Sequence, residues 1–192
     1  MSTLTRGAAL RALAARRTDQ IVVPTMTALA GWHAIQQSDL DMPCVGAMGS
    51  ASSMALGLAI ARPERQVWVL DGDGSLLMQL GSLATIGEAA PSNLYHFVFH
   101  NGVYAFSGDQ EIPGGREIDF SLMARAAHYS AAFVFDDAES LSTGLNDVFE
   151  APGPVMIQLK LDDATDDGLP MREIPLNPGE RGRRLRRILA SK

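Results

Sequence analysis

Two aspartates separated by a glycine stand directly after an apolar stretch of the sequence, where they could bind a metal ion. Asp71 and Asp73 belong to the run Asp-Gly-Asp-Gly-Ser, which ends at Ser75. Unpaired carboxylates beside a protein core are costly, and a hard cation such as Mg²⁺ is a physical reason to keep them there. The intervening glycines let the backbone approach a ligand closely, and the amides of such a turn can bind an anion. A simple Asp-Gly turn between a strand and a helix is the structural alternative.

A second polar group follows the next apolar stretch. Residues 94–99 are apolar, and His100 and Asn101 come directly after them. If both stretches are strands of one parallel sheet, Asn101 and Asp73 lie at the same edge, where open α/β sheets bind ligands. An asparagine oxygen is a suitable neutral ligand, and Mg²⁺ usually shares few protein ligands with phosphate oxygens. The sequence therefore predicts one Mg²⁺–phosphate site between Asp73 and Asn101.

The elements that must position these residues alternate along the chain, which favours a three-layer α/β/α fold with a mostly parallel sheet. The apolar stretches predict strands at 20–23, 44–45, 66–70, 94–99, 132–135 and 155–161. Helices are predicted at 5–16, 26–35, 51–60, 80–89, 120–127 and 138–149. Residues 101–117, rich in glycine, predict a long loop of the kind that often serves function. We expect one domain over 1–161, then a C-terminal arm and basic tail over 162–192.

Charge and composition exclude several classes of protein. The net charge is −6, but residues 180–192 contain six basic residues and one acidic residue, so the rest of the chain carries −11. A body this acidic argues against a nucleic-acid surface. No apolar run approaches the roughly 20 residues of a membrane span. The single cysteine, Cys44, excludes an internal disulfide and favours a reducing cytoplasm.

The spacing of the polar groups resembles a known family. Gly-Asp-Gly at 72–74, then 26 residues, then Asn101 is similar to the cofactor motif of thiamine-diphosphate enzymes. The segment 46–53 resembles the part of these enzymes that holds the cofactor's pyrimidine, and 101–110 resembles a loop of small decarboxylase subunits. The resemblance covers roughly residues 20–161 and is strongest to the sulfopyruvate and phosphonopyruvate decarboxylases. It implies a diphosphate-binding (PP-type) α/β fold.

The resemblance also implies roles for individual residues. The side chains of Asp73 and Asn101 and the carbonyl of Val103 would ligate Mg²⁺. The cofactor thiamine diphosphate would contact a wider set, namely Gly46, Met48, Gly49, Gly72, Asp73, Gly74, Ser75, Asn101, Val103 and Tyr104. Within this set Met48 would support the bent cofactor from below, and the Gly46 carbonyl would accept from the 4′-amino group. These contacts would hold that amino group near the thiazolium C2, where a reactive ylid forms.

Three further residues near this motif are weaker candidates. His100 could move protons beside the site, or it could pack on the opposite face of its strand. Asp109 and Gln110, in the loop after Asn101, could contact the substrate or close over it. No residue of this chain is a certain catalytic group.

The family also uses a glutamate that activates the cofactor's pyrimidine, and that glutamate belongs to a separate pyrimidine-binding domain. We find no second domain of that kind in these 192 residues. We therefore expect a partner chain, an α-type subunit, with the cofactor held between the two chains in an α₂β₂ or larger assembly. The expected reaction is non-oxidative decarboxylation of a small 2-oxo acid bearing a sulfonate- or phosphonate-like group.

Three alternatives stay open from the sequence. A carboligating enzyme of the acetolactate synthase type would use the same cofactor. A haloacid-dehalogenase-like phosphatase would use Asp71 as nucleophile and Asp73 as acid/base. That motif needs a mid-chain lysine and then an acidic pair, whereas the only lysines are Lys160, two residues before Asp162, and Lys192. A non-catalytic subunit that kept the fold is the third alternative.

Overall fold

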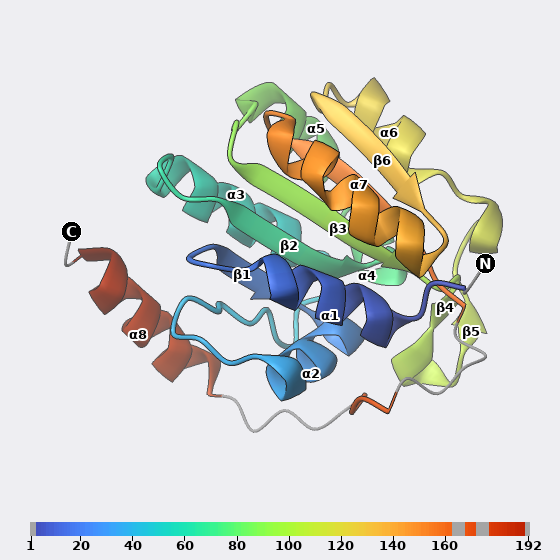
Figure 1. The fold of residues 1–192 in the computed structure, drawn as a ribbon, viewed down its shortest axis with the longest axis horizontal. Coiled ribbons are helices and arrows are strands. Elements are labelled where there is room, and N and C mark those ends of the chain that lie inside the picture. The colour runs from blue at the N-terminus through green and yellow to red at the C-terminus, as the bar shows by residue number, and fades with distance from the viewer. Residues whose placement is uncertain (1–2, 163–167, 172–176, 191–192) are drawn as a thin grey trace.

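The computed structural model describes residues 3–162, 168–171 and 177–190, and its centre is a five-stranded sheet (Figure 1). Every neighbouring pair of strands in this sheet is parallel. Across the sheet the strands are β1 (Ile21–Pro24), β2 (Val67–Gly72), β3 (Leu94–His100), β7 (Val155–Lys160) and β6 (Ala131–Phe135). All predicted strands except 44–45 are present, as is the predicted mostly parallel α/β fold.

Helices cover both faces of the sheet, which makes the three layers (Figure 1). One face carries α1 (Arg6–Arg16), α2 (Met26–Ile35) and α7 (Ala138–Glu150), and the other carries α3 (Ala51–Ala61), α5 (Ser82–Ala89) and α6 (Phe120–Ala126). The central strands β2 and β3 are apolar almost throughout because both of their faces are covered. The strand predictions rested on this uninterrupted pattern.

Each face has its own hydrophobic core. On the first face the indole of Trp68 stacks on Phe149, with ring centroids 5.0 Å apart and planes 13° apart. On the second face smaller side chains such as Val69 and Val98 pack against α3, α5 and α6. Alternation along β2 therefore sends the odd-numbered residues toward the second face, which decides where Asp71 points.

The predicted strand at 44–45 is wrong. The chain makes only an isolated bridge there, between Thr25 and Cys44, with one backbone bond from the Cys44 N–H to the Pro24 carbonyl. Pro43 precedes this bridge, and Gly46, with φ of +75°, ends the extended backbone directly after it. Proline and a left-handed glycine around two residues leave no room for a ladder.

The segment 101–117 has more structure than the sequence predicts. It holds the antiparallel hairpin of β4 (Val103–Tyr104) and β5 (Gln110–Glu111), with 3₁₀ turns at Ala105–Ser107 and Gly115–Glu117. The buried side chain of Ile112 and its N–H bond to the Gly102 carbonyl, 3.0 Å, fix the base of the hairpin. We call residues 101–117 the hairpin segment. A short helix, α4 (Asp73–Leu77), also begins directly after β2 and is shorter than a sequence pattern can reveal.

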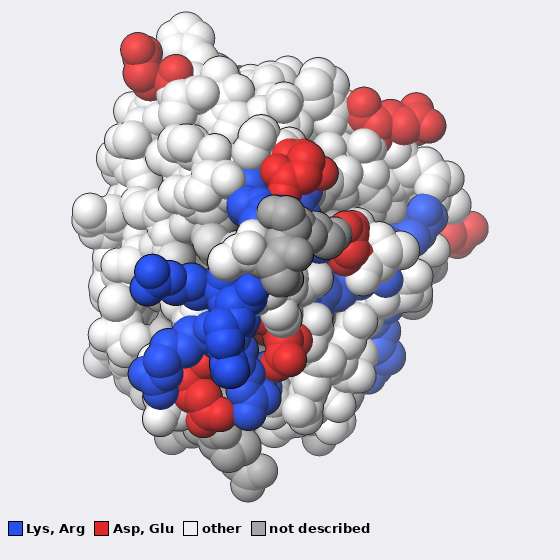
Figure 2. Space-filling view, turned by 90° about the vertical axis from the view of Figure 1, so that its left-hand side faces the viewer, with Lys and Arg blue, Asp and Glu red and all other residues white. Residues whose placement is uncertain are grey.

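The C-terminal helix α8 (Pro178–Ala190) packs on α3 through Leu185, on the side of the molecule away from the hairpin (Figure 1). Its arginines gather on one face of the surface (Figure 2). Part of the predicted arm, residues 163–167 and 172–176, lies outside the described residues, and 168–171 pass beside α1, where the Arg6 guanidinium donates to the Leu169 carbonyl. Among the helices that the structure describes, none is long and apolar enough to span a membrane.

Candidate functional site

A cavity of about 260 Å³ opens at the carboxyl ends of β2 and β3. The start of α2, the start of α4 and the hairpin segment form its walls. The described lining includes these residues singled out from the sequence: Met48, Gly72, Asp73, Gly74, Ser75, Asn101, Val103, Tyr104 and Gln110. Residues up to 62 positions apart in the chain, Met48 to Gln110, thus meet at one edge of the sheet, where open α/β sheets bind ligands.

The carboxylate of Asp73 ties the two strand ends together. Its Oδ1 accepts a hydrogen bond from the Gly74 N–H at 2.7 Å, within the first turn of α4. Its Oδ2 accepts from the Gly102 N–H, also at 2.7 Å, at the start of the hairpin segment. A carboxylate has about four lone-pair positions, so each oxygen retains capacity for a cation.

Asn101 lies against the same carboxylate from the end of β3. Its side-chain Oδ1 accepts from the Val103 N–H at 3.1 Å, which shapes the turn into β4. The side chain of Asp73 is almost fully buried, and Asn101 is only 9% exposed. Both predicted side-chain ligands therefore line the cavity directly after the ends of neighbouring strands, and Val103 lines the same cavity.

Two glycines allow the backbone to come close at this edge. A Cβ on Gly74 would lie 2.4 Å from the Tyr104 ring, so only glycine lets the hairpin pack on the first turn of α4. Gly49 has φ of +81°, and a Cβ there would meet Gln79 at 2.6 Å. Its N–H donates to the Ser75 hydroxyl at 3.0 Å, which joins the segment 46–53 to the aspartate–glycine run.

The electrostatics of the site fit a cation with an anionic ligand. Burial raises the pKa of Asp73, and the N–H groups of Gly102 and Gly74 oppose that rise. A buried carboxylate is stabilised when a cation lies beside it. Mg²⁺ prefers oxygen ligands such as the side chains of Asp73 and Asn101, and Gly72 has no Cβ to keep a phosphate group away from its backbone. The residues present therefore fit a magnesium diphosphate.

Asp71, by contrast, is not among the described residues that line the cavity. Its side chain is fully buried on the second face of the sheet, where Oδ2 lies 3.3 Å from His96 Nε2. The other ring nitrogen of His96 lies 3.3 Å from the Tyr129 hydroxyl. Burial, and then the charge of Asp71, raise the pKa of Tyr129. A buried carboxylate paired with an imidazole cannot act as an exposed nucleophile, which removes the geometric basis of the phosphatase alternative.

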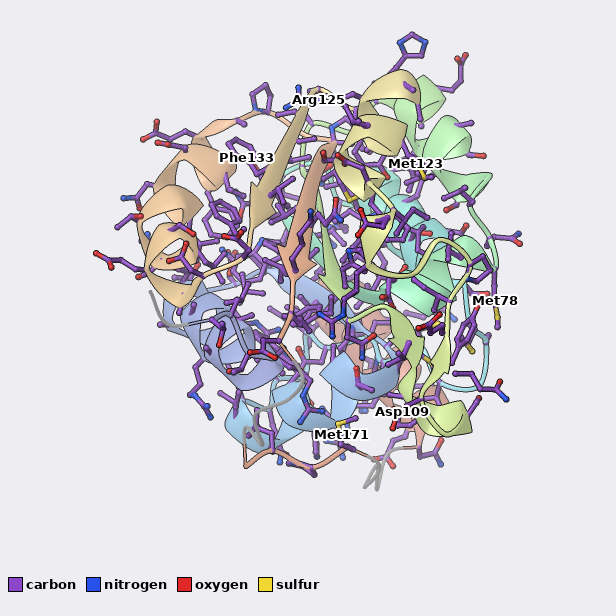
Figure 3. All side chains as sticks on the ribbon, turned by 90° about the vertical axis from the view of Figure 1, so that its right-hand side faces the viewer. Met78, Asp109, Met123, Arg125, Phe133 and Met171 are labelled. Carbon is purple, nitrogen blue, oxygen red and sulfur yellow. The ribbon has the colours of Figure 1, made fainter. Side chains whose placement is uncertain are left out.

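Four other sequence candidates also lie outside the described lining of the cavity. Gly46 is exposed, whereas Gly49 is buried where its N–H donates to the Ser75 hydroxyl. Asp109 is exposed, with φ of +57°, at the tip of the hairpin, which Figure 3 shows from its outer side. His100 is buried behind the Asp73 carboxylate, and its Nε2 lies 4.0 Å from Oδ2.

The structure adds wall residues that the sequence did not indicate. Met26 and Thr27 begin α2, and Met26 has φ of +49°, a strained conformation for a non-glycine residue. Met78 lies just beyond α4, and Phe106 lies in the hairpin. The threonine before Met26 is a helix-start signal, but the left-handed backbone of Met26 leaves no mark in the sequence.

The fold and the site together define an α/β domain with a ligand-sized cavity at the carboxyl edge of a parallel sheet. The profile of the family described as "Thiamine pyrophosphate enzyme, C-terminal TPP binding domain" matches residues 25–159. The chain belongs to this family.

Individual proteins agree with this assignment. A phosphonopyruvate decarboxylase from Streptomyces viridochromogenes is 36% identical over 97% of this chain, which covers 47% of that protein. A sulfopyruvate decarboxylase subunit beta from Methanothermobacter thermautotrophicus is 46% identical over 55% of this chain and 56% of its own length. The chain thus spans about half the length of these relatives. A solved structure from Mycobacterium smegmatis, described as a candidate thiamin diphosphate-dependent enzyme, shares the fold with a TM-score of 0.68 at 20% identity, over 83% of this chain and 32% of that one.

Proposed function

We propose that this chain is the thiamine-diphosphate- and Mg²⁺-binding part of a cytoplasmic 2-oxoacid decarboxylase whose substrate carries a sulfonate- or phosphonate-like group. The observation that carries the proposal is the convergence of Asp73 and Asn101 on one cavity. Asp73, Asn101 and the Val103 carbonyl would hold the metal, and Gly74 and Ser75 would contact the diphosphate. The bound cofactor would supply an electron sink for the carbanion left when CO₂ departs.

This chain's own residues would bind and orient the cofactor while other groups perform the acid–base chemistry. The described lining of the cavity contains neither glutamate nor histidine. The glutamate that activates the pyrimidine is therefore expected from a partner chain with a pyrimidine-binding domain. The relative from Methanothermobacter thermautotrophicus is named as a beta subunit, which supports a heteromeric enzyme. The α₂β₂ or larger assembly is our proposal.

The cavity also suggests how substrate recognition is divided. Its described lining has no lysine or arginine, and its exposed polar side chains are Ser107 and Gln110 on the hairpin. Neutral donors can orient a sulfonate or phosphonate, but a charge-assisted hydrogen bond is roughly twice as strong. We therefore expect the cation that selects the anionic substrate to come from the partner, with Gln110 orienting the substrate from this side and Asp109 closing over it.

Reconstitution with the partner tests this function. Co-expressed with the protein of the neighbouring reading frame, the chain should release CO₂ from sulfopyruvate or phosphonopyruvate when thiamine diphosphate and Mg²⁺ are present. Pyruvate is the control substrate, and acetolactate formation from it would instead indicate a carboligase. The chain alone should show no decarboxylation, and full activity without a partner would contradict a shared active site.

A further inference from the structure

The side chain of Gln158 lies beside His100 in the interior of the sheet. Gln158 is in β7 and is fully buried, and His100 ends β3 with only 3% exposure. In the register of these strands Val98 is opposite Gln158, so Gln158 and His100 are diagonal neighbours on the face that packs against α6. Neither belongs to the described lining of the cavity.

The partners of Gln158 fix the orientation of its amide. Its Nε2 lies 3.1 Å from the Ile118 carbonyl, which can only accept, and its Oε1 lies 3.3 Å from the Ser121 N–H, which can only donate. The same Nε2 lies 2.8 Å from His100 Nδ1. The amide therefore donates both of its hydrogens, to the Ile118 carbonyl and to His100 Nδ1.

The amide of Gln158 in turn fixes the tautomer of the His100 imidazole. Because His100 Nδ1 accepts from Gln158, the ring's proton is on Nε2, which donates to the Gly115 carbonyl at 3.0 Å. The Asp73 carboxylate, 4.0 Å from the same nitrogen, is too far for a hydrogen bond. Every polar atom of both side chains is thus used, and the proton of His100 points at the backbone rather than into the cavity.

The bond to Gly115 closes the hairpin segment at its base. His100 precedes this segment, and Gly115 lies near its end, 15 residues further on. Between them lie Asn101, Val103 and Tyr104, which form one wall of the cavity. Gln158 also holds Ile118 and Ser121, where the chain leaves the segment and begins α6. The Phe120 ring packs edge-on against His100, with centroids 5.4 Å apart.

We propose that Gln158 and His100 are positioning residues that hold the hairpin segment at its base, so that its wall residues meet the cofactor in the correct place. The proposal rests on the proposed function for its effect on the cofactor, but not for its effect on the hairpin. We call the Gln158 and His100 side chains the clamp, and its loss should act mainly on cofactor affinity. A proton-transfer role for His100 would act mainly on the rate at saturating cofactor.

Two substitutions of His100 separate these roles, because neither asparagine nor glutamine can carry a proton. His100→Gln places an amide near the former Nε2, so it can still donate to the Gly115 carbonyl. His100→Asn can still accept from Gln158 but is too short to reach Gly115. Gln158→Leu removes the clamp from the other side without touching a residue next to Asn101.

Each variant would be assembled with its partner, and three quantities would be measured. These are the rate of chymotrypsin cleavage after Phe106 in the hairpin, the Kd of Mg²⁺–thiamine diphosphate, and kcat at saturating cofactor. We expect His100→Asn and Gln158→Leu to be cleaved faster and to weaken the cofactor Kd roughly three- to tenfold, with a smaller change in kcat. His100→Gln should restore most of the protection and affinity that His100→Asn loses.

Two results would overturn the proposal. Equal loss of kcat in both His100 variants, with unchanged cleavage and Kd, would show that His100 transfers protons. Wild-type cleavage rates in His100→Asn and Gln158→Leu would show that the two side chains do not hold the hairpin. Cleavage is read without cofactor, so a wild-type complex that fails to bind thiamine diphosphate would contradict the proposed function while the cleavage rates still decide the clamp.

Discussion

Asp71 and Asp73 are two residues apart and both are buried, yet they belong to different parts of the molecule. Asp71 is the last inward-facing residue of β2 and pairs with His96 beneath the second face of the sheet. Asp73 begins α4, and its carboxylate receives N–H groups from both strand ends beside the cavity. The change from strand to helix at Gly72 separates them. We therefore assign Asp71 to the stability of the fold and propose ligand binding for Asp73.

The largest expected difference between the two residues concerns the cofactor. Asp73→Asn removes the negative charge and places an amide donor against one of two backbone N–H groups. Because even groups that only support a metal ligand change metal affinity 10–100-fold, we expect the affinity for Mg²⁺–thiamine diphosphate to fall at least about 100-fold. Calorimetry on the assembled enzyme measures this loss.

Asp71→Asn is the matched control for that experiment. An asparagine there can accept from the Gly72 N–H, as Asp71 does at 2.9 Å, and can donate to His96. Cofactor affinity should stay close to that of the wild type. Equal losses in the two variants would mean that Asp71 also takes part in the site and that the contrast between them is wrong.

The next-largest effect is on the free energy of unfolding, where we expect the substitution of Asp71 to cost more than that of Asp73. Asp71→Ala leaves His96 buried without its carboxylate partner, and an unsatisfied buried polar group costs about 1–3 kcal/mol. Urea unfolding should show this loss. Asp73→Ala should lose less, because removal of a carboxylate that burial disfavours offsets part of the cost of leaving the N–H groups of Gly74 and Gly102 without an acceptor. Tyr129→Phe, which removes the other partner of His96, should show a smaller loss than Asp71→Ala. A stable Asp71→Ala variant with weakened cofactor binding would contradict this assignment.

The smallest effect concerns α6, which packs on the same face as Asp71. Asp119 caps this helix through the Leu122 N–H, and losing such a cap costs about 1 kcal/mol. The Asp119 carboxylate accepts a hydrogen bond from the Ser121 hydroxyl. This bond is the main cause that lowers the pKa of Asp119 below 3.8. The stabilisation is therefore complete above the unfolded pKa and is lost as the pH falls through the lower folded value.

Asp119→Ala should consequently differ from the wild type in urea unfolding at neutral pH and approach it in strong acid. Cofactor affinity should be unchanged, because Asp119 is not among the described residues that line the cavity. Asp119→Asn keeps the acceptor and should recover most of the loss without the dependence on pH. A constant difference between Asp119→Ala and the wild type across this pH range would contradict the role of the ionised cap.

The parts of the site that the sequence could predict depend on regular backbone. Asp73 and Asn101 each follow an apolar strand, and parallel strands bring their carboxyl ends to one edge whatever the details of packing. The glycines beside Asp73 were expected to let a ligand approach the backbone, which stays a prediction, and the structure shows instead that Gly74 lets the Tyr104 ring pack closely. Their roles toward Mg²⁺ and the cofactor remain predictions.

The parts that the sequence could not predict depend on local turns and on tertiary contacts. Two-residue strands such as β4 and β5 have no detectable period, so the hairpin was expected only as a loop. The left-handed backbone of Met26, at the start of α2 on the cavity wall, is not signalled by its residue type. Gln158 joins the arrangement from a strand 57 residues after Asn101, through pairing that only the fold reveals. The prediction of a strand at 44–45 was wrong because Pro43 and Gly46 flank these two residues and end the extended backbone.

Binding of the cofactor with and without a divalent cation is the most direct test of the account. In calorimetry, the enzyme assembled with its partner should bind thiamine diphosphate tightly in Mg²⁺ and lose most of that affinity when a chelator removes the metal. Restored Mg²⁺ should recover binding in the wild type but not in Asp73→Asn. Equal affinity with and without the cation would contradict a metal held between Asp73 and Asn101.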